Sequence, residues 1–243
     1  MPLSAADRFR ALQARGVARP DLRGGDLLRR AGVPDPLARN VNSSLELGNS
    51  KVCAQTGTTT ELNLADYFAA NDMKYELVAA ATADEAVRAY DSSRCDVLTT
   101  DASALHSERL KMSKPDDHVI LTDMISKEPL GPAIRQNDPQ WLNIVKWTHF
   151  AMVNAEELGV SQKTIDAALK TSKPEVRRLV GTDGNFGEQI SLTKDWVVRI
   201  IRHVGNYAEA YDRNVGVKTP LGIPRGLNQN WLAGGILYAP PIR

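Results

Sequence analysis

Between residues 51 and 121, short apolar runs alternate with longer segments of helical spacing, and this pattern limits the chain to few folds. The runs expected to be strands cover 51–54, 75–80, 95–99 and 118–121. The expected helices cover 61–71, 82–92 and 102–112. Strands that alternate with helices favour a mostly parallel sheet with helices on its faces. The sequence therefore predicts an α/β fold for this part of the chain.

The chain after residue 138 has mainly helical patterns. Asp138 followed by Pro139 is typical of a helix start, and Gly159 is typical of its end. Further helices are expected from Ser161, from Pro174 to Gly181 and, as the longest, over 195–214. The tail from Gly216 is rich in Gly and Pro, and we expect it to lie as an ordered strap over the fold.

The composition of the 243 residues excludes several classes of protein. Lys and Arg number 30 and Asp and Glu 29, so the net charge of +1 gives no electrostatic case for binding nucleic acid. The sequence lacks a run of about 18 apolar residues, so we expect no direct membrane insertion. The first residues lack the basic and apolar stretches of a secretory signal peptide.

Residues 14–40 differ in composition from the rest of the chain. They contain six Arg with Gly, Pro, Ala, Leu and Asp, but no Lys, aromatic residue, Ile, Ser or Thr. One interpretation is a poorly ordered basic loop, in which Gly and Pro prevent any helix except over 26–31. The interpretation that we favour is out-of-frame translation from a GC-rich gene, which produces such a residue set.

Two polar segments follow expected strands, at the edge where α/β sheets bind ligands. In the first, Gln55 to Glu61, Gly57 permits a tight turn, and Thr58 with Glu61 has the spacing of a capping box. The backbone N–H groups at such a helix start favour a carboxylate or phosphate. A plain capped helix explains the same residues. The segment is not a phosphate-binding P-loop, because the Gly-Lys-Ser/Thr ending is missing.

The second polar segment contains Thr100 and Asp101. Asp101 either caps the next helix or holds an ammonium group by charge-assisted hydrogen bonds. An anion site after one strand and a carboxylate after a nearby strand together suit a zwitterion such as an α-amino acid. The sequence has no HExxH, GxSxG or CxxC motif, and we expect neither a metal nor a catalytic residue. Cys53 and Cys95 are either two small buried thiols or, in an oxidising compartment, one disulfide.

Several segments together resemble one known family. They are KVCAQTGTTTELNLADYFAANDMKY, RCDVLTTDASAL, ISKEPLGPAIRQNDPQW, NAEELGV, GNYAEAYDRNVG and RGLNQNWLAGGILYAPPIR. They resemble the general L-amino-acid-binding proteins of bacterial polar amino-acid ABC importers, within the solute-binding proteins of family 3. The resemblance covers 41–243 almost continuously. It implies a periplasmic-binding-protein-like (type II) fold with two hinged lobes, a periplasmic location, membrane permease subunits as partners and no cofactor.

The resemblance also implies roles for individual residues. Thr58 and Thr59 would donate to the α-carboxylate of an L-amino acid, and Asp101 would accept from its α-ammonium. Gln55 and Thr100 could contact the side chain of the ligand. The two Cys residues match the family's cysteine pair, which favours the disulfide over two free thiols.

The resemblance divides the chain at definite positions. Residues 1–40 would hold a remnant of the first lobe and the aberrant Arg-rich segment, 41–48 the hinge, 49–126 the second lobe, and 127–243 the return crossing with helices that brace the first lobe. The family's signal peptide, and the strand whose Arg clamps the ligand carboxylate, have no counterpart here. We therefore expect an intact second lobe, an incomplete first lobe and weak or absent amino-acid binding.

Two other interpretations remain. Dehydratases of small carboxylic acids share the two-lobed fold, and such an enzyme needs a general acid or base that faces its ligand. The polar segments offer only Asp101 and Glu61 for this role, and both have simpler explanations. The third interpretation is a pseudogene product without function.

Overall fold

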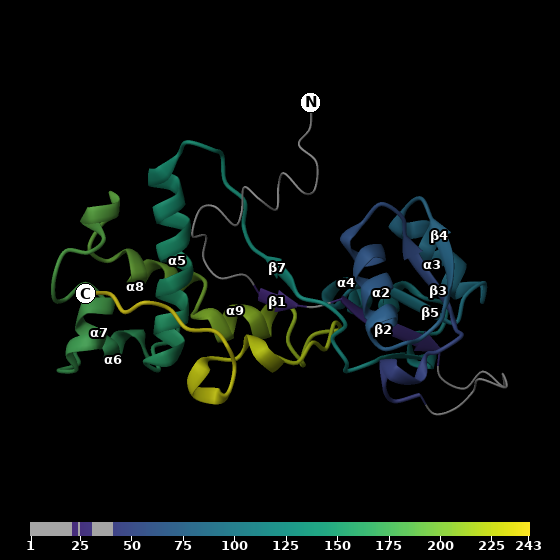
Figure 1. Ribbon diagram of the computed structural model, residues 1–243. Helices are drawn as coiled ribbons and strands as arrows, with labels where there is room; N and C mark the ends of the chain where they lie inside the picture. The colour runs from purple at the N-terminus through teal and green to yellow at the C-terminus, as the bar shows by residue number, and fades with distance from the viewer. Residues whose placement is uncertain (1–20, 24, 31–40) are drawn as a thin grey trace. The chain divides into compact units, whose positions relative to one another are not determined.

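The computed structural model describes residues 21–23, 25–30 and 41–243 (Figure 1). The chain divides into one unit of Leu22–Pro129 and another that holds Leu130–Arg243. Strands β1 (Asp21–Arg23) and β7 (Glu128–Leu130), where the chain passes between the units, pair in a two-stranded sheet. The predicted first-lobe remnant and much of the Arg-rich segment lie outside the described residues.

The Leu22–Pro129 unit is built on a five-stranded sheet in the order β4-β3-β5-β2-β6. Strand β3 (Lys51–Gln55) runs parallel to β4 (Glu76–Ala80) and to β5 (Val97–Asp101). Strand β2 (Gly25–Arg30) runs antiparallel to both β5 and β6 (His118–Ile120). Since β5 and β6 both oppose β2, they run parallel to each other. The prediction of an α/β fold with a mostly parallel sheet is confirmed.

Strand β2 corrects the reading of the Arg-rich segment. The sequence allowed a helix there only over 26–31, but the backbone is extended, with Gly25 opposite Asp101, and Leu28 opposite both Leu98 and Ile120. Strands β5 and β6 would otherwise leave backbone N–H and C=O groups unpaired inside the sheet. Tertiary context therefore outweighs local propensity in this segment.

Helices cover both faces of this sheet (Figure 1). Because side chains alternate along a strand, Val52 and Val97 face one way, and Cys53 and Leu98 the other. The first pair packs with Leu64 and Phe68 of α2 (Thr59–Ala70). The second pair packs with residues of α3 (Ala83–Asp91) and α4 (Ala102–Lys111), chiefly Tyr90 and Leu105. The described residues of this unit also contain the 3-10 turns η1 (Ser44–Glu46) and η2 (Pro115–Asp117).

A disulfide joins Cys53 of β3 to Cys95, which lies two residues before β5, with their Cα atoms 5.8 Å apart. Both residues are buried in the core between the sheet and helices α3 and α4. The bond therefore fastens together the two strands that end at the predicted polar segments.

The other unit is helical in the residues described. Its helices are α5 (Pro139–Glu157), α6 (Ile165–Ala168), α7 (Pro174–Leu179), α8 (Trp196–His203) and α9 (Tyr207–Asn214), with 3-10 turns η3 (Glu188–Ile190), η4 (Gly226–Asn228) and η5 (Trp231–Ala233). The predicted start of α5 is confirmed, because the Asp138 carboxylate accepts from the Trp141 amide at 2.9 Å. Trp196, Val197 and Ile201 of α8 pack with Ala151 and Ala155 of α5. In the described part of the chain, no helix is both long and apolar enough to span a bilayer.

The single long helix predicted over 195–214 is wrong. Gly205 ends α8 with a φ of +88°, a left-handed conformation that favours glycine. Asn206 then begins α9 with a full capping box, in which it exchanges hydrogen bonds of 2.9 Å with Glu209. The apolar stripe continues through Val204, so periodicity alone does not reveal this break. Helix α5, with 19 residues, is longer than either piece.

Arg225 fastens the C-terminal tail to α5. Its guanidinium donates to both oxygens of Glu156, at 3.0 and 3.1 Å, and to the Asn228 carbonyl. It also lies over the rings of Tyr207 and Tyr211, 5.3 and 5.4 Å from their centroids. Burial raises the pKa of the Glu156 carboxyl above its ordinary value, and the charge of Arg225 offsets part of this effect.

Candidate functional site

A cavity of about 260 Å³ lies at the carboxyl ends of β3 and β5 in the Leu22–Pro129 unit. Its walls come from the β3–α2 turn, the start of α3, the end of β5 and one face of α4. The described lining residues are Gln55, Thr58, Thr59, Thr60, Ala83, Ala86, Val87, Leu98, Thr99, Thr100, Asp101, Ala104 and Glu108. The structure thus brings together all the predicted ligand-contacting residues except Gly57, which lies in the turn beside the cavity.

Gly57 shapes the turn through its backbone conformation. Its φ is +70°, in the left-handed region that favours glycine. Apart from Gly57 itself and its two neighbours in the chain, no described atom lies within 4 Å of the position that a Cβ would take, so conformation rather than space requires a glycine. The turn directs the chain from the end of β3 into α2.

The start of α2 departs from the expected capping box. The Thr58 hydroxyl accepts from the Glu61 amide at 3.4 Å, as expected, but the Glu61 carboxylate accepts from the Gly57 amide at 2.7 Å. The Thr58 hydroxyl also donates to the Gln55 carbonyl at 2.7 Å, so its only proton is committed. Thr58 is therefore left with its backbone N–H group as a donor to a ligand. The amides of Thr59 and Thr60, at the first two helical positions, have no acceptor within the helix by geometry.

Asp101 is both the last residue of β5 and the N-cap residue of α4, yet its side chain makes no capping hydrogen bond. Its carboxylate is half-buried in the cavity wall, and this burial raises its pKa above the ordinary value. Burial favours the neutral form of a carboxyl group that has no cationic partner. A nearby cation favours the charged form again. The sequence allowed two roles for the Asp101 side chain, helix capping and the binding of an ammonium group. The side chain does not perform the first of these.

Groups of opposite electrostatic character therefore line the cavity. The N-terminal end of α2 carries the positive end of the helix dipole. The Asp101 and Glu108 carboxylates are the acidic groups, and none of the lining residues that the structure describes is basic. A small molecule with one anionic and one cationic group matches this arrangement. No group of three or more potential metal ligands occurs within the described residues.

The sequence did not identify every lining residue. Thr60 lies next to the predicted residues, whereas Ala83, Ala86 and Val87 come from α3 and Ala104 and Glu108 from α4. A usable signal was present for α4, because positions three and seven after Asp101 share its face of a helix.

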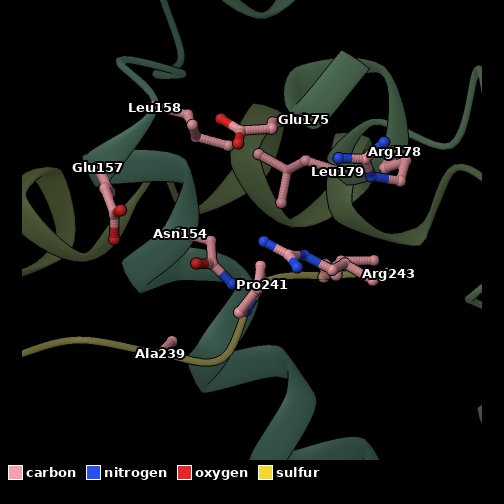
Figure 2. A pocket seen from close by; sticks show the side chains of 10 residues that line it. Asn154, Glu157, Leu158, Glu175, Arg178, Leu179, Ala239, Pro241 and Arg243 are labelled. Atoms are coloured by element: carbon pink, nitrogen blue, oxygen red, sulfur yellow. The ribbon is translucent and has the colours of Figure 1, made fainter.

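A second cavity, of about 170 Å³, lies in the helical unit among α5, α7 and the C-terminal tail (Figure 2). Asn154, Glu157, Glu175, Arg178 and Arg243 supply its polar lining. The Asn154 amide already donates to the Pro240 carbonyl at 2.9 Å, and two acidic and two basic side chains line this cavity. None of the ligand-contacting residues predicted from the sequence is among its described lining residues.

Comparison with known proteins shows clear relatives. The chain is 51% identical over 206 residues to the general L-amino acid-binding periplasmic protein AapJ of Rhizobium johnstonii, and 46% identical over 204 residues to the glutamate/glutamine/aspartate/asparagine-binding protein BztA of Rhodobacter capsulatus. Each match covers 84% of this chain and 60% of the relative, so the chain spans about 60% of the length of these curated relatives. No protein-family model matches the sequence.

A solved structure is also similar. It is an ABC transporter periplasmic binding protein from Brucella ovis with glutathione bound, 42% identical in sequence with a TM-score of 0.83. The match covers 100% of this chain and 82% of that one. The similarity therefore extends over both the sheet-containing and the helical unit.

Proposed function

This chain belongs to the periplasmic binding proteins of ABC transporters, and from that membership we propose that it binds an L-amino acid as the substrate-binding component of an importer. The observation that carries the proposal is the cavity of the Leu22–Pro129 unit, where the start of α2 and the Asp101 carboxylate line one space. The names of the relatives, which specify amino acids, support the same class of ligand.

In this proposal the helix start holds the carboxylate of the ligand. The backbone amides of Thr58, Thr59 and Thr60, with the Thr59 hydroxyl, are the donors that α2 offers to an anion. Gly57 sets the turn that exposes them, and Glu61 is held away on the Gly57 amide. Recognition then depends on charge-assisted hydrogen bonds, without any covalent step.

Asp101 accepts from the α-ammonium of the ligand. Without a ligand, burial raises the pKa of this carboxyl, and an ammonium at hydrogen-bond distance lowers it again. Gln55 and Thr100 lie on the same edge and contact the ligand side chain. Glutathione, present in the Brucella ovis structure, carries a free α-amino and α-carboxylate pair at its γ-glutamyl end, so it belongs among the ligands to test.

The proposal includes a partner and a compartment. The protein acts in the periplasm and delivers its ligand to the membrane permease subunits of an ABC importer, as the names of its relatives suggest. The relatives named above are binding proteins rather than enzymes, which supports a role without catalysis. We assign residues 49–126, which fall inside the Leu22–Pro129 unit, to the second lobe of the family fold.

Asp101→Asn tests the proposal, because it keeps the shape of the side chain and removes its charge. Because the strand whose Arg would clamp the ligand carboxylate has no counterpart here, we expect calorimetric titration with L-amino acids and glutathione to show weak binding to the unchanged protein. In the variant we expect a further loss of about tenfold or more. Thermal unfolding should show a variant that is at least as stable, since it no longer buries an unpaired charge. Equal affinities for both proteins would contradict the role of Asp101, and the absence of binding to the unchanged protein would contradict the function.

The same carboxyl gives binding a pH dependence. As the pH falls through the raised pKa of Asp101, the carboxyl gains a proton and loses its attraction for the ammonium, so affinity should fall. We expect calorimetry to show weaker binding at about pH 4 than at about pH 7. The Asn variant is the control, because it lacks this titration, and a parallel decline in both proteins would contradict the assignment.

A further inference from the structure

We propose that Glu108 determines specificity in the same cavity, by selecting ligands whose long side chain ends in a cation, such as L-lysine or L-arginine. This inference rests on the proposed function, because it requires the α-ammonium of the ligand to be held at Asp101. It adds a preference among amino acids. The start of α2 and Asp101 cannot provide one, because they bind the α-carboxylate and the α-ammonium, which all α-amino acids share.

The first support is the placement of Glu108 on α4. Asp101, Ala104 and Glu108 follow one another at spacings of three and four residues, so they lie on one face of the helix, and all three line the cavity. Seven residues of helix span about 10 Å along the axis. Glu108 lines the same cavity as Asp101, so a four-carbon side chain that starts from an α-ammonium held at Asp101 can extend along this face toward Glu108.

The second support is the size of the apolar residues that line the cavity together with the two carboxylates. Ala104 on α4 and Ala83 and Ala86 on α3 are small, and together with Val87 they form an apolar wall. The methylene groups of a long side chain suit such a wall, whereas a charged end requires a partner beyond it. A terminal carboxylate, as in L-glutamate, would instead face a like charge at Glu108.

The third support is the state of the Glu108 carboxylate. Its side chain is only 19% exposed, and Oε1 accepts from Lys111 at 2.8 Å, whereas the Lys111 side chain is 62% exposed. Lys111 thus approaches from the solvent side and is not among the described lining residues. A carboxylate has about four acceptor positions, so it can hold Lys111 and a ligand cation together.

The test compares ligands that differ only at the end of the side chain. Calorimetry with L-lysine and with L-norleucine, which lacks the terminal ammonium, should show tighter binding of L-lysine to the unchanged protein. In Glu108→Gln we expect the affinity for L-lysine to fall about tenfold, while the affinities for L-norleucine and L-alanine stay within about twofold. Glu76→Gln is the matched control, because it removes the same charge from an exposed position in the same unit and should change none of the affinities.

Each outcome separates this inference from the proposed function. Equal losses for L-lysine and L-norleucine, or no loss for L-lysine, would overturn the role of Glu108 while binding itself stands. Should no ligand bind the unchanged protein, L-alanine included, the proposed function fails and this inference fails with it. If Glu108→Gln does not fold, as judged by its thermal unfolding, Glu108→Asp takes its place, and a lysine-selective loss is again the expected result.

Discussion

Replacement of Cys53 and Cys95 by Ser should lower the free energy of unfolding of the Leu22–Pro129 unit by about 2–4 kcal/mol. The disulfide closes a loop between residues 42 positions apart, which restricts the unfolded chain. The disulfide also lies in the apolar core, where burial of the two Ser hydroxyl groups would be unfavourable. Urea unfolding followed by circular dichroism measures the change.

The control for this prediction is the unchanged protein in the presence of a reductant. Reduction should shift its unfolding midpoint to lower urea, whereas the double Ser variant should unfold alike with and without the reductant. An unchanged protein that unfolds identically in both conditions would contradict a stabilising disulfide. Since the bond joins β3 to the entrance of β5, its loss should also loosen the placement of Gln55 relative to Asp101.

Replacement of Arg225 by Met should destabilise the helical unit by about 3 kcal/mol, near the lower end of the range for a broken buried ion pair. The Arg225 and Glu156 side chains are only 14% and 17% exposed, so the variant leaves a carboxylate buried without its partner. The contacts of the guanidinium with the rings of Tyr207 and Tyr211 are lost as well. Urea unfolding again measures the effect, and release of the tail should appear as faster proteolysis near residue 225.

A double variant separates the charge from the packing. Adding Glu156→Gln to Arg225→Met should recover part of the loss, because the buried group is then neutral. The pKa of Glu156 is raised in the folded state, so the single variant should also recover stability as the pH falls and the carboxyl gains a proton. A deficit that is the same at low and neutral pH, and in both variants, would contradict this explanation.

The sheet of the Leu22–Pro129 unit was predictable, because apolar alternation and helix caps act locally. Val52 and Cys53 face opposite sides as their spacing requires, and Asp138 caps α5 as its position before Pro139 indicates. Strand β2 was not predictable, since its residues carry no strand pattern and the unpaired edges of β5 and β6 determine its conformation. The break at Gly205 was hidden by an apolar stripe that continues across it.

The candidate site was predictable in part for a similar reason. Asp101 ends β5 and Thr58 lies in the turn after β3, so the carboxyl edge of these parallel strands brings them together. The hydrogen bonds around Thr58 were not predictable, because the choice of Glu61 between the amides of Gly57 and Thr58 depends on the local turn. Glu108 lies seven residues beyond Asp101, so the helical spacing could have placed it on the same face of α4, whereas the α3 residues of the cavity wall carry no such signal.

A titration of the ¹⁵N-labelled full chain with L-alanine, monitored by amide chemical shifts, shows whether the cavity beside Asp101 binds an α-amino acid. We expect the largest shifts at Thr58, Thr59 and Asp101, and we expect propionate, which lacks the ammonium, to leave Asp101 nearly unchanged. Largest shifts around Asn154 and Arg178 in the cavity of the helical unit, or no shifts with L-alanine at all, would contradict it.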